Sequence, residues 1–394
     1  MRYMTGMLAA LVLASTTALA AQASDQGAFV VTLGRDTIVF ERYTRSGAQI
    51  EGDMLLRNTG AVVLRHYAGT LNADGSMATF EMTNRPAATP QARGTRFVAR
   101  FGDTTVVDVT RDTTTSTLRV PTPGGALPFL NFSYAMYELF GRRALATHRD
   151  TITTLPLGAG EITPLVVGHP AANTLTVGFR DDAPTRFGVD ADGRILSVDG
   201  SATTQKVQGT RVASLDFAAL TAAFQNRPLG QLSPPDSVRA TIGGASVAID
   251  YSRPGMRGRT IFGGIIPWGQ VWRTGANAAT RITTSADLMI GGQRVPAGSY
   301  TLWTLPAASG WKLIVNKQTK APCTGAAECT SPTRARLWGT DYDADSDFVR
   351  IDMQATPLDA PVEQFAITVE PQGAGAVMAF TWEKTRVWVN LAKP

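Results

Sequence analysis

The chain has 394 residues, of which 44% are hydrophobic and 18% are charged, and its formal net charge is +5. This composition is typical of a folded globular protein and excludes a wholly disordered chain. The 37 basic residues are scattered along the sequence, so there is no basic stripe of the kind that binds nucleic acid. Because single hydrophobic cores stop growing at about 250 to 300 residues, we expect two domains.

Residues 1–23 have the pattern of a secretory signal peptide. Arg2 precedes an apolar stretch at 7–14, and Ala-x-Ala cleavage sites lie at 18–20 and at 21–23. The apolar stretch is too short to cross a bilayer, and no later run approaches the roughly 20 residues of a transmembrane helix. No cysteine stands near either cleavage site to carry a lipid. The sequence therefore predicts a soluble periplasmic or secreted protein that is neither membrane-spanning nor a lipoprotein.

The only two cysteines, Cys323 and Cys329, lie six residues apart in KAPCTGAAECTSP. Because disulfides persist in exported proteins, we expect these two cysteines to be bonded to each other. A zinc site would need further ligands, and the three histidines, His66, His148 and His169, lie far upstream. We therefore predict neither a metal nor a cofactor.

Residues 24–225 predict a β-rich domain with one helix. Segments such as DTIVFERY, MATFEMT and TTVVDVT alternate apolar and polar residues, as half-buried strands do. In LPFLNFSYAMYELFGRRALA, residues 127–146, apolar residues recur at spacings of three and four, which predicts an amphipathic helix. Strands resume after it, and LDFAALTAAF at 215–224 predicts a short second helix. We expect an antiparallel curved sheet or half-barrel packed on the first helix; the alternative is a carrier whose concave face receives a hydrophobic ligand.

A proline-rich polar stretch at 226–236, within QNRPLGQLSPPDS, predicts a linker between two separately folding pieces. We expect this linker to be the main protease-sensitive connection. Beyond it, residues 237–394 contain about nine short alternating segments separated by Gly-Gly and other turns. This spacing favours a C-terminal β-sandwich, so the predicted fold class is mainly β throughout.

Several motifs of the C-terminal part occur in a distinctive order. They are DYSRPGMRGRTIFGGIIPWGQVWRTGANAAT, then GGQRVPAGSYTLWTLP, then FTWEKTRVWV near the end. In this order they resemble the bacterial family catalogued as domain of unknown function 2911, from about Ala240 to Leu391. The resemblance implies a fold and an exported setting but no activity and no catalytic residue. Between Lys320 and Arg336 the sequence departs from the family pattern by what reads as an inserted loop, and the N-terminal part carries no resemblance.

The segment at 253–280 is rich in glycine and proline and predicts a long irregular loop. Loops of that length are usually functional or pinned by side-chain hydrogen bonds. In one interpretation three polar residues bond the backbone along the loop: Arg273, Asn277 and Thr280. In the other, a tryptophan stacks on a sugar or peptide while arginines bind an acidic group. The candidate ligand-binding residues are then Arg253, Arg257, Arg259, Trp268 and Trp272.

DYDADSDFVRID, residues 341–352, partly matches the spacing of a calcium-binding loop. Its sixth position is Ser346 where a glycine makes the sharp turn, and its twelfth is Asp352 where a bidentate glutamate is usual. Because FVRIDM then alternates as a strand does, we interpret this segment as a solvated acidic turn that leads into a strand; the alternative is a weak calcium site.

No known catalytic motif is present. The sequence lacks a nucleophile elbow, a phosphate-binding loop, a dinucleotide fingerprint and a zinc-protease motif. We therefore assign no catalytic residue and expect a non-catalytic binding module of the envelope or the extracellular space, with a glycan or an acidic small molecule as ligand. Two alternatives remain open: a carboxylate-dependent hydrolase of envelope or polymeric carbohydrate, and a hydrophobic-ligand carrier acting through the N-terminal domain. The sequence leaves the oligomeric state open.

Overall fold

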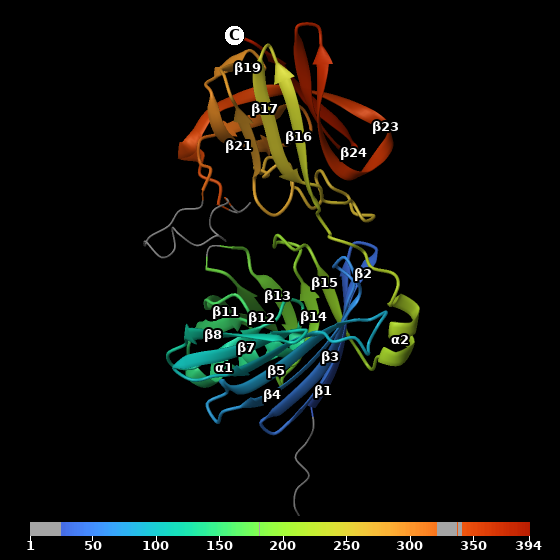
Figure 1. The fold of residues 1–394 in the computed structure, drawn as a ribbon, viewed down its shortest axis with the longest axis vertical. Helices are drawn as coiled ribbons and strands as arrows, with labels where there is room; N and C mark the ends of the chain where they lie inside the picture. Colours follow the sequence, from blue (N-terminus) through green and yellow to red (C-terminus); the bar gives the residue numbers. More distant parts are fainter. Residues whose placement is uncertain (1–24, 181, 321–336, 338–340) are drawn as a thin grey trace, which may run out of the picture.

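The computed structural model describes residues 25–180, 182–320, 337 and 341–394. Their strands form two sheets that share no strand, one of 15 strands and one of 9 (Figure 1). We call residues 25–224 the N-terminal unit and residues 235–394 the C-terminal unit. The predicted signal peptide and the predicted Cys323–Cys329 disulfide lie outside the described residues. Within the described part, no helix has both the length and the apolar character that crossing a bilayer requires.

The N-terminal sheet consists of two antiparallel meanders joined side by side. β1 to β8 follow one another across half of the sheet, β10 to β15 across the other half, and β1 pairs with β15 at the centre. The short β9 pairs with β10 in parallel at one edge. The strands are β1 (Asp25–Leu33), β2 (Asp36–Ser46), β3 (Gln49–Leu56), β4 (Val63–Leu71), β5 (Met77–Pro86), β6 (Thr95–Arg100), β7 (Thr104–Arg111), β8 (Thr114–Pro121), β9 (Leu127–Phe129), β10 (Thr151–Pro156), β11 (Thr163–Ala171), β12 (Thr174–Gly178), β13 (Thr185–Val189), β14 (Ile195–Asp199) and β15 (Gln208–Val212).

Helix α1 (Tyr134–Thr147) lies in the concave side of this sheet (Figure 1). The predicted helix at 127–146 begins seven residues too early, because β9 occupies its first three residues and Phe132 has a positive φ of 65°. Ten residues of α1 are buried, so the helix lacks the broad solvent-exposed face of the predicted amphipathic helix. Tyr134 contacts the rings of both Phe29 on β1 and Phe187 on β13. The curved sheet therefore wraps around α1, and the side chains of α1 fill the concave face.

Helix α2 (Phe217–Phe224) lies on the opposite, convex face of the same sheet. Its Phe217 packs against Phe40 and Leu55, which alternate with the core-facing residues of β2 and β3. The Asp216 side chain caps the helix by accepting a hydrogen bond from the Ala219 amide at 3.0 Å. Both helices predicted in the N-terminal part are therefore present.

The C-terminal sheet folds over itself around a main hydrophobic core, and a smaller cluster is formed by Ala279, Trp303, Ile314 and Leu337. Its strand order is β16-β17-β18-β21-β22-β23-β24-β19-β20, and the first strand, β16, also lies against β23 and β24. Buried residues of all these layers form one hydrophobic cluster, in agreement with the predicted β-sandwich. The elements are β16 (Pro235–Ile242), β17 (Ala245–Ser252), β18 (Thr280–Thr284), β19 (Leu288–Ile290), β20 (Gln293–Val295), β21 (Gly298–Leu305), β22 (Trp311–Asn316), the 3-10 turn η1 (Ala344–Ser346), β23 (Asp347–Gln372) and β24 (Gly375–Ala392).

Candidate functional site

The loop at 253–279 connects β17 to β18. In its WRTGAN segment, Thr274, Gly275 and Asn277 have positive φ values of 55°, 155° and 60°. A β-branched residue such as threonine rarely adopts this region. Internal hydrogen bonds hold the turn; among them, the Thr280 hydroxyl donates to the Thr274 carbonyl at 2.6 Å, and the Trp272 indole donates to the Gly275 carbonyl at 3.1 Å.

The three arginines that the sequence singled out as ligand contacts bind groups of the protein itself. Arg253 donates to the Phe365 carbonyl at 3.1 Å, and Arg259 donates to two carbonyls of its own loop at 2.9 and 2.7 Å. Arg257 forms an ion pair with Asp36 of β2, with 2.5 Å between Nη1 and Oδ2. This last contact joins the C-terminal unit to the N-terminal unit.

The two tryptophans differ in accessibility. Trp272 is buried and stacks on Trp382, with ring centroids 5.7 Å apart. Trp268 is 44% exposed and stacks on Phe262 at 6.3 Å. Of these two, only Trp268 is substantially exposed to solvent.

The three residues interpreted as structural do not behave alike. The Thr280 hydroxyl donates within the loop to the Thr274 carbonyl, and the Asn277 amide donates to the Ser233 carbonyl at 3.4 Å. The Arg273 guanidinium, by contrast, makes no hydrogen bond or ion pair with any residue in the described ranges, and its Nε is buried without a partner. Burial lowers the pKa of Arg273 to about 10. The carbonyl acceptors that the structural interpretation requires for Arg273 are therefore missing from the described part.

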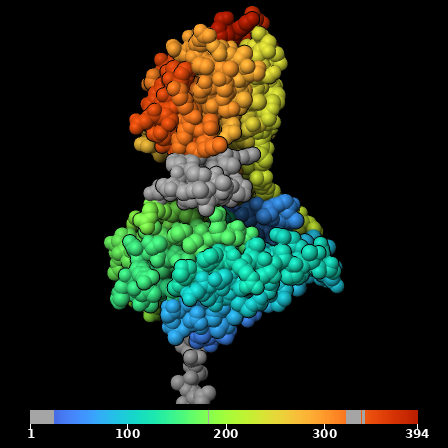
Figure 2. All heavy atoms as spheres, turned by 60° about the vertical axis from the view of Figure 1, so that its left-hand side comes forward, coloured from blue at the N-terminus to red at the C-terminus, as the bar shows by residue number. Residues whose placement is uncertain are grey.

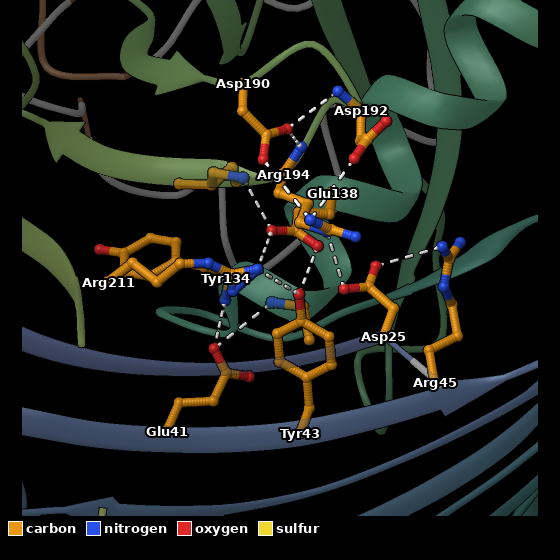
Figure 3. A network of polar contacts seen from close by, with 12 residues as sticks. Asp25, Glu41, Tyr43, Arg45, Tyr134, Glu138, Asp190, Asp192, Arg194 and Arg211 are labelled. Carbon is orange, nitrogen blue, oxygen red and sulfur yellow. Dashed lines mark hydrogen bonds and ion pairs between the residues drawn. The ribbon is translucent and has the colours of Figure 1, made fainter. Parts of the chain in front are cut away.

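A buried carboxylate, Glu41 of β2, caps helix α1 from the sheet (Figure 3). It accepts hydrogen bonds from the Tyr67 hydroxyl at 2.9 Å, the Ser133 hydroxyl at 2.5 Å and the Tyr134 amide at 2.6 Å. Ser133 stands at the N-cap position but makes no cap bond of its own, so Glu41 replaces it as acceptor for the first amides of the helix. Burial raises the pKa of Glu41 to about 7, and the bonds from Ser133 and Tyr67 oppose that rise.

A second buried carboxylate, Glu138, ties α1 to both halves of the sheet (Figure 3). It accepts hydrogen bonds from the Tyr43 hydroxyl of β2 and from the Ile195 amide of β14 at 2.7 Å. Arg211 of β15 lies 3.4 Å from its Oε1. Burial raises the pKa of Glu138, while its hydrogen bonds and the charge of Arg211 lower it.

The network continues to the rim of the unit through Asp25. Asp25 accepts from Arg194 at 3.0 Å and from Arg45 at 3.3 Å (Figure 3). It also accepts from Arg142 at 3.3 Å. Because Glu41 and Glu138 are enclosed behind this rim, a substrate has no access to them. Both carboxylates therefore serve the fold, and they do not form the facing pair in an open cleft that a glycoside hydrolase needs.

Glu41 and Glu138 could have been found from the sequence, because each lies among apolar residues at a position that faces the core. Glu41 stands in phase with Val39 and Tyr43, on the side of β2 that faces the core. Glu138 lies in the middle of the apolar segment YAMYELF. A carboxylate in phase with buried residues indicates a satisfied internal acceptor or a functional group.

We expect Glu41 to make stability depend on pH. Its folded-state pKa of about 7 lies above its ordinary value of 4.5, so the folded protein binds more protons than the unfolded chain between these values. The contribution of Glu41 to the free energy of unfolding is therefore greatest below about pH 4.5. It falls by about 3 kcal/mol in total as the pH rises through 7. Urea unfolding between pH 4.5 and 8 gives the free energy of unfolding of the wild type and of Glu41→Gln at each pH. The difference between the two proteins should change with pH by this amount. A difference that stays constant with pH would contradict the assignment.

A groove opens on the convex face of the N-terminal sheet beside α2. Its volume is about 520 Å³. Across its floor, Arg42, Asp53, His66 and Thr83 stand in register on β2, β3, β4 and β5. Asp53 accepts from Arg42 and from His66, each at 2.9 Å. The full lining is Arg42, Asp53, Leu64, Arg65, His66, Glu81, Thr83, Arg85, Pro90, Phe217, Ala218 and Thr221.

The comparison with protein families matches only the part of the chain that forms the second sheet. Residues 233–391 match the family described as Protein of unknown function (DUF2911). The DUF2911 match starts near the end of the link after α2 and covers β16 to β24 together with the loop at 253–279. The N-terminal unit has no family match. A search of curated proteins found no match for the chain.

In the acidic turn of the DUF2911 part, Asp343 and Asp347 accept hydrogen bonds from neighbouring residues. Asp343 accepts from the Asp345 amide at 3.0 Å and from the Ser346 hydroxyl at 2.6 Å, which caps η1. Asp347 accepts from the Tyr342 hydroxyl and from Arg350, both at 2.8 Å. Across the described ranges, no three His, Cys, Asp or Glu side chains are grouped as a metal site would require.

Proposed function

We propose that this protein is an exported binding module that takes a small acidic ligand, such as an acidic sugar, in the groove beside α2. The observation that supports this proposal is the groove itself, whose volume of about 520 Å³ falls within the range of small-molecule sites. It combines apolar side chains, Leu64, Pro90 and Phe217, with several charged ones.

The charges of the groove favour an acidic ligand. Three arginines and two carboxylates line it, and the carboxylate of Asp53 is already engaged by Arg42 and His66. Arg42 also lies over the Phe217 ring, 4.7 Å from its centroid, which fixes its position. Arg85 is exposed and has no hydrogen-bond or ion-pair partner in the described ranges. Its guanidinium is therefore available to bind a carboxylate or phosphate through two parallel hydrogen bonds.

The other two functions have less support. For a carboxylate-dependent hydrolase, the two carboxylates whose pKa values are raised by burial, Glu41 and Glu138, are enclosed and occupied by internal donors. For a hydrophobic-ligand carrier, the concave face of the sheet is filled by α1, whose Met136 and Phe140 are completely buried. A binding module needs neither an accessible carboxylate pair nor an open interior.

A matched pair of sugars tests the proposal. We expect N-acetylmuramic acid to raise the melting temperature of the full chain and N-acetylglucosamine, which lacks the carboxylate, to raise it less. Arg85→Ala should weaken the binding of the acidic sugar about tenfold or more, the loss typical of a charged hydrogen bond. Arg294→Ala, which removes an exposed arginine of β20 outside the groove, is the control and should leave binding unchanged. Equal binding by wild type and Arg85→Ala would refute the groove as the site.

A further inference from the structure

The two units meet closely on one side of their junction. Figure 2 shows the N-terminal unit, in blue to green, and the C-terminal unit, in yellow to red, stacked one on the other. The turn between β1 and β2 contacts the DUF2911 loop: the Arg35 amide donates to the Arg257 carbonyl at 2.9 Å, next to the Arg257–Asp36 ion pair. Gly34 is required there, because a Cβ at this position would lie 2.2 Å from the Arg257 carbonyl oxygen. The junction thus brings charged loops of both units together.

Beside these paired groups, the junction holds cations that form no ion pair with a carboxylate of the described residues. Arg273 of the C-terminal unit has a buried Nε without an acceptor, whereas its two terminal nitrogens are not among the buried unpaired atoms. Lys206, on the N-terminal turn between β14 and β15, bonds through Nζ only to the Ser201 carbonyl, at 2.8 Å. Arg259 bonds only to carbonyls. None of the three forms an ion pair with a residue in the described ranges.

Lys206 lies within electrostatic range of Arg273 and of Arg259, and Glu363 and Asp36 act on Arg259 without forming an ion pair with it. Burial lowers the pKa of Lys206 first, and the charges of Arg273 and Arg259 lower it further. Among the described residues, the carboxylate of Asp182 acts on Arg273 but has no hydrogen bond to it. Like charges that face each other across a partly buried junction repel, and a buried guanidinium without an acceptor is unfavourable. Both costs are removed if an anion with several oxygen atoms lies between them.

We propose that a multivalent oxyanion, a phosphate or polycarboxylate group, binds at this junction to Arg273, Lys206 and Arg259 and bridges the two units. The planar guanidinium of Arg273 suits two oxygens of such a group, and the Lys206 ammonium adds a point charge from the opposite unit. This site is separate from the groove beside α2 and does not depend on it. Because the anion would be bound by residues of both units, it would also oppose their separation.

Thermal unfolding of the full chain in sodium phosphate, sodium citrate and sodium chloride at equal ionic strength tests this proposal. We expect phosphate or citrate to raise the melting temperature more than chloride does, and the stronger of the two identifies the preferred oxyanion. Arg273→Ala should abolish this specific increase, and Lys206→Ala should weaken oxyanion binding about tenfold. Arg294→Ala should leave it unchanged. An increase that is the same in chloride, or that survives both Arg273→Ala and Lys206→Ala, would overturn the proposal.

Two further measurements keep the test decisive. If Arg273→Ala does not fold, Lys206→Ala carries the test, because Lys206 lies at a partly exposed turn with a single hydrogen bond. Limited proteolysis of the link at 225–234 separates bridging from binding to one unit. Phosphate or citrate should slow cleavage of the wild type but not of Lys206→Ala, and an oxyanion that leaves cleavage of the wild type unchanged would exclude bridging.

Discussion

Replacement of Glu41 by alanine is expected to destabilise the N-terminal unit by about 3 to 5 kcal/mol, the loss that follows removal of one partner from a buried charged network. The substitution leaves the hydroxyls of Tyr67 and Ser133 and the Tyr134 amide without an acceptor in the core. Chemical unfolding followed by circular dichroism measures the loss.

Glu41→Gln separates the hydrogen bonds from the charge. The amide oxygen can still accept from the helix amides, and the two hydroxyls can rotate to accept from the amide nitrogen. We therefore expect Glu41→Gln to cost less than about half of the loss seen with alanine. If alanine and glutamine destabilise the protein equally, the cap is not the reason why Glu41 is buried.

Replacement of Glu138 by alanine is expected to cost about 3 to 4 kcal/mol for a related reason. Arg211 would lose its carboxylate, and the Ile195 amide would lose its acceptor inside the unit. Because Glu138 contacts β2, β14 and β15 at once, its loss should loosen α1 against both meanders of the sheet. Hydrogen exchange at the α1 amides should rise together with the loss in the free energy of unfolding.

A double-mutant cycle isolates the contribution of the Glu138–Arg211 pair. The coupling between Glu138→Ala and Arg211→Ala should reach about 1 kcal/mol or more, since both side chains lie largely out of solvent. The exposed pair Arg96–Glu81 has a shorter separation of 2.6 Å and is the matched control. Its coupling should stay below about 1 kcal/mol because solvent screens it. Equal coupling in the two pairs would show that burial adds nothing at Glu138.

Much of the fold could be predicted from local patterns. Alternation of apolar and polar residues located most strands, because a strand with one buried face must repeat every two residues. Spacings of three and four located α1, but its start was wrong since Leu127–Phe129 finds a parallel partner in β10. The motifs around WRTGANAAT pointed to the C-terminal family correctly, within a few residues of the matched range.

The roles of the arginines could not be predicted, because a guanidinium donates to whichever acceptors the fold places near it. Sequence assigned Arg257 to a ligand and Arg273 to the backbone. In the structure Arg257 meets Asp36, which lies more than two hundred residues away along the chain, and Arg273 meets no described acceptor. Spacing along a loop contains no information about such distant partners.

The sequence by itself therefore determined the mainly β fold class and the family match of the C-terminal part, because periodicity and the order of short motifs are local properties, whereas export and the domain boundaries stay predictions. Only the tertiary structure decided where the charged groups are used. It enclosed Glu41 and Glu138 around α1, opened the groove by setting four strands in register beneath α2, and left Arg273 unpaired at the junction. The physical reason is that desolvation and ion pairing depend on distances between atoms in the folded chain, and long-range strand pairing sets those distances.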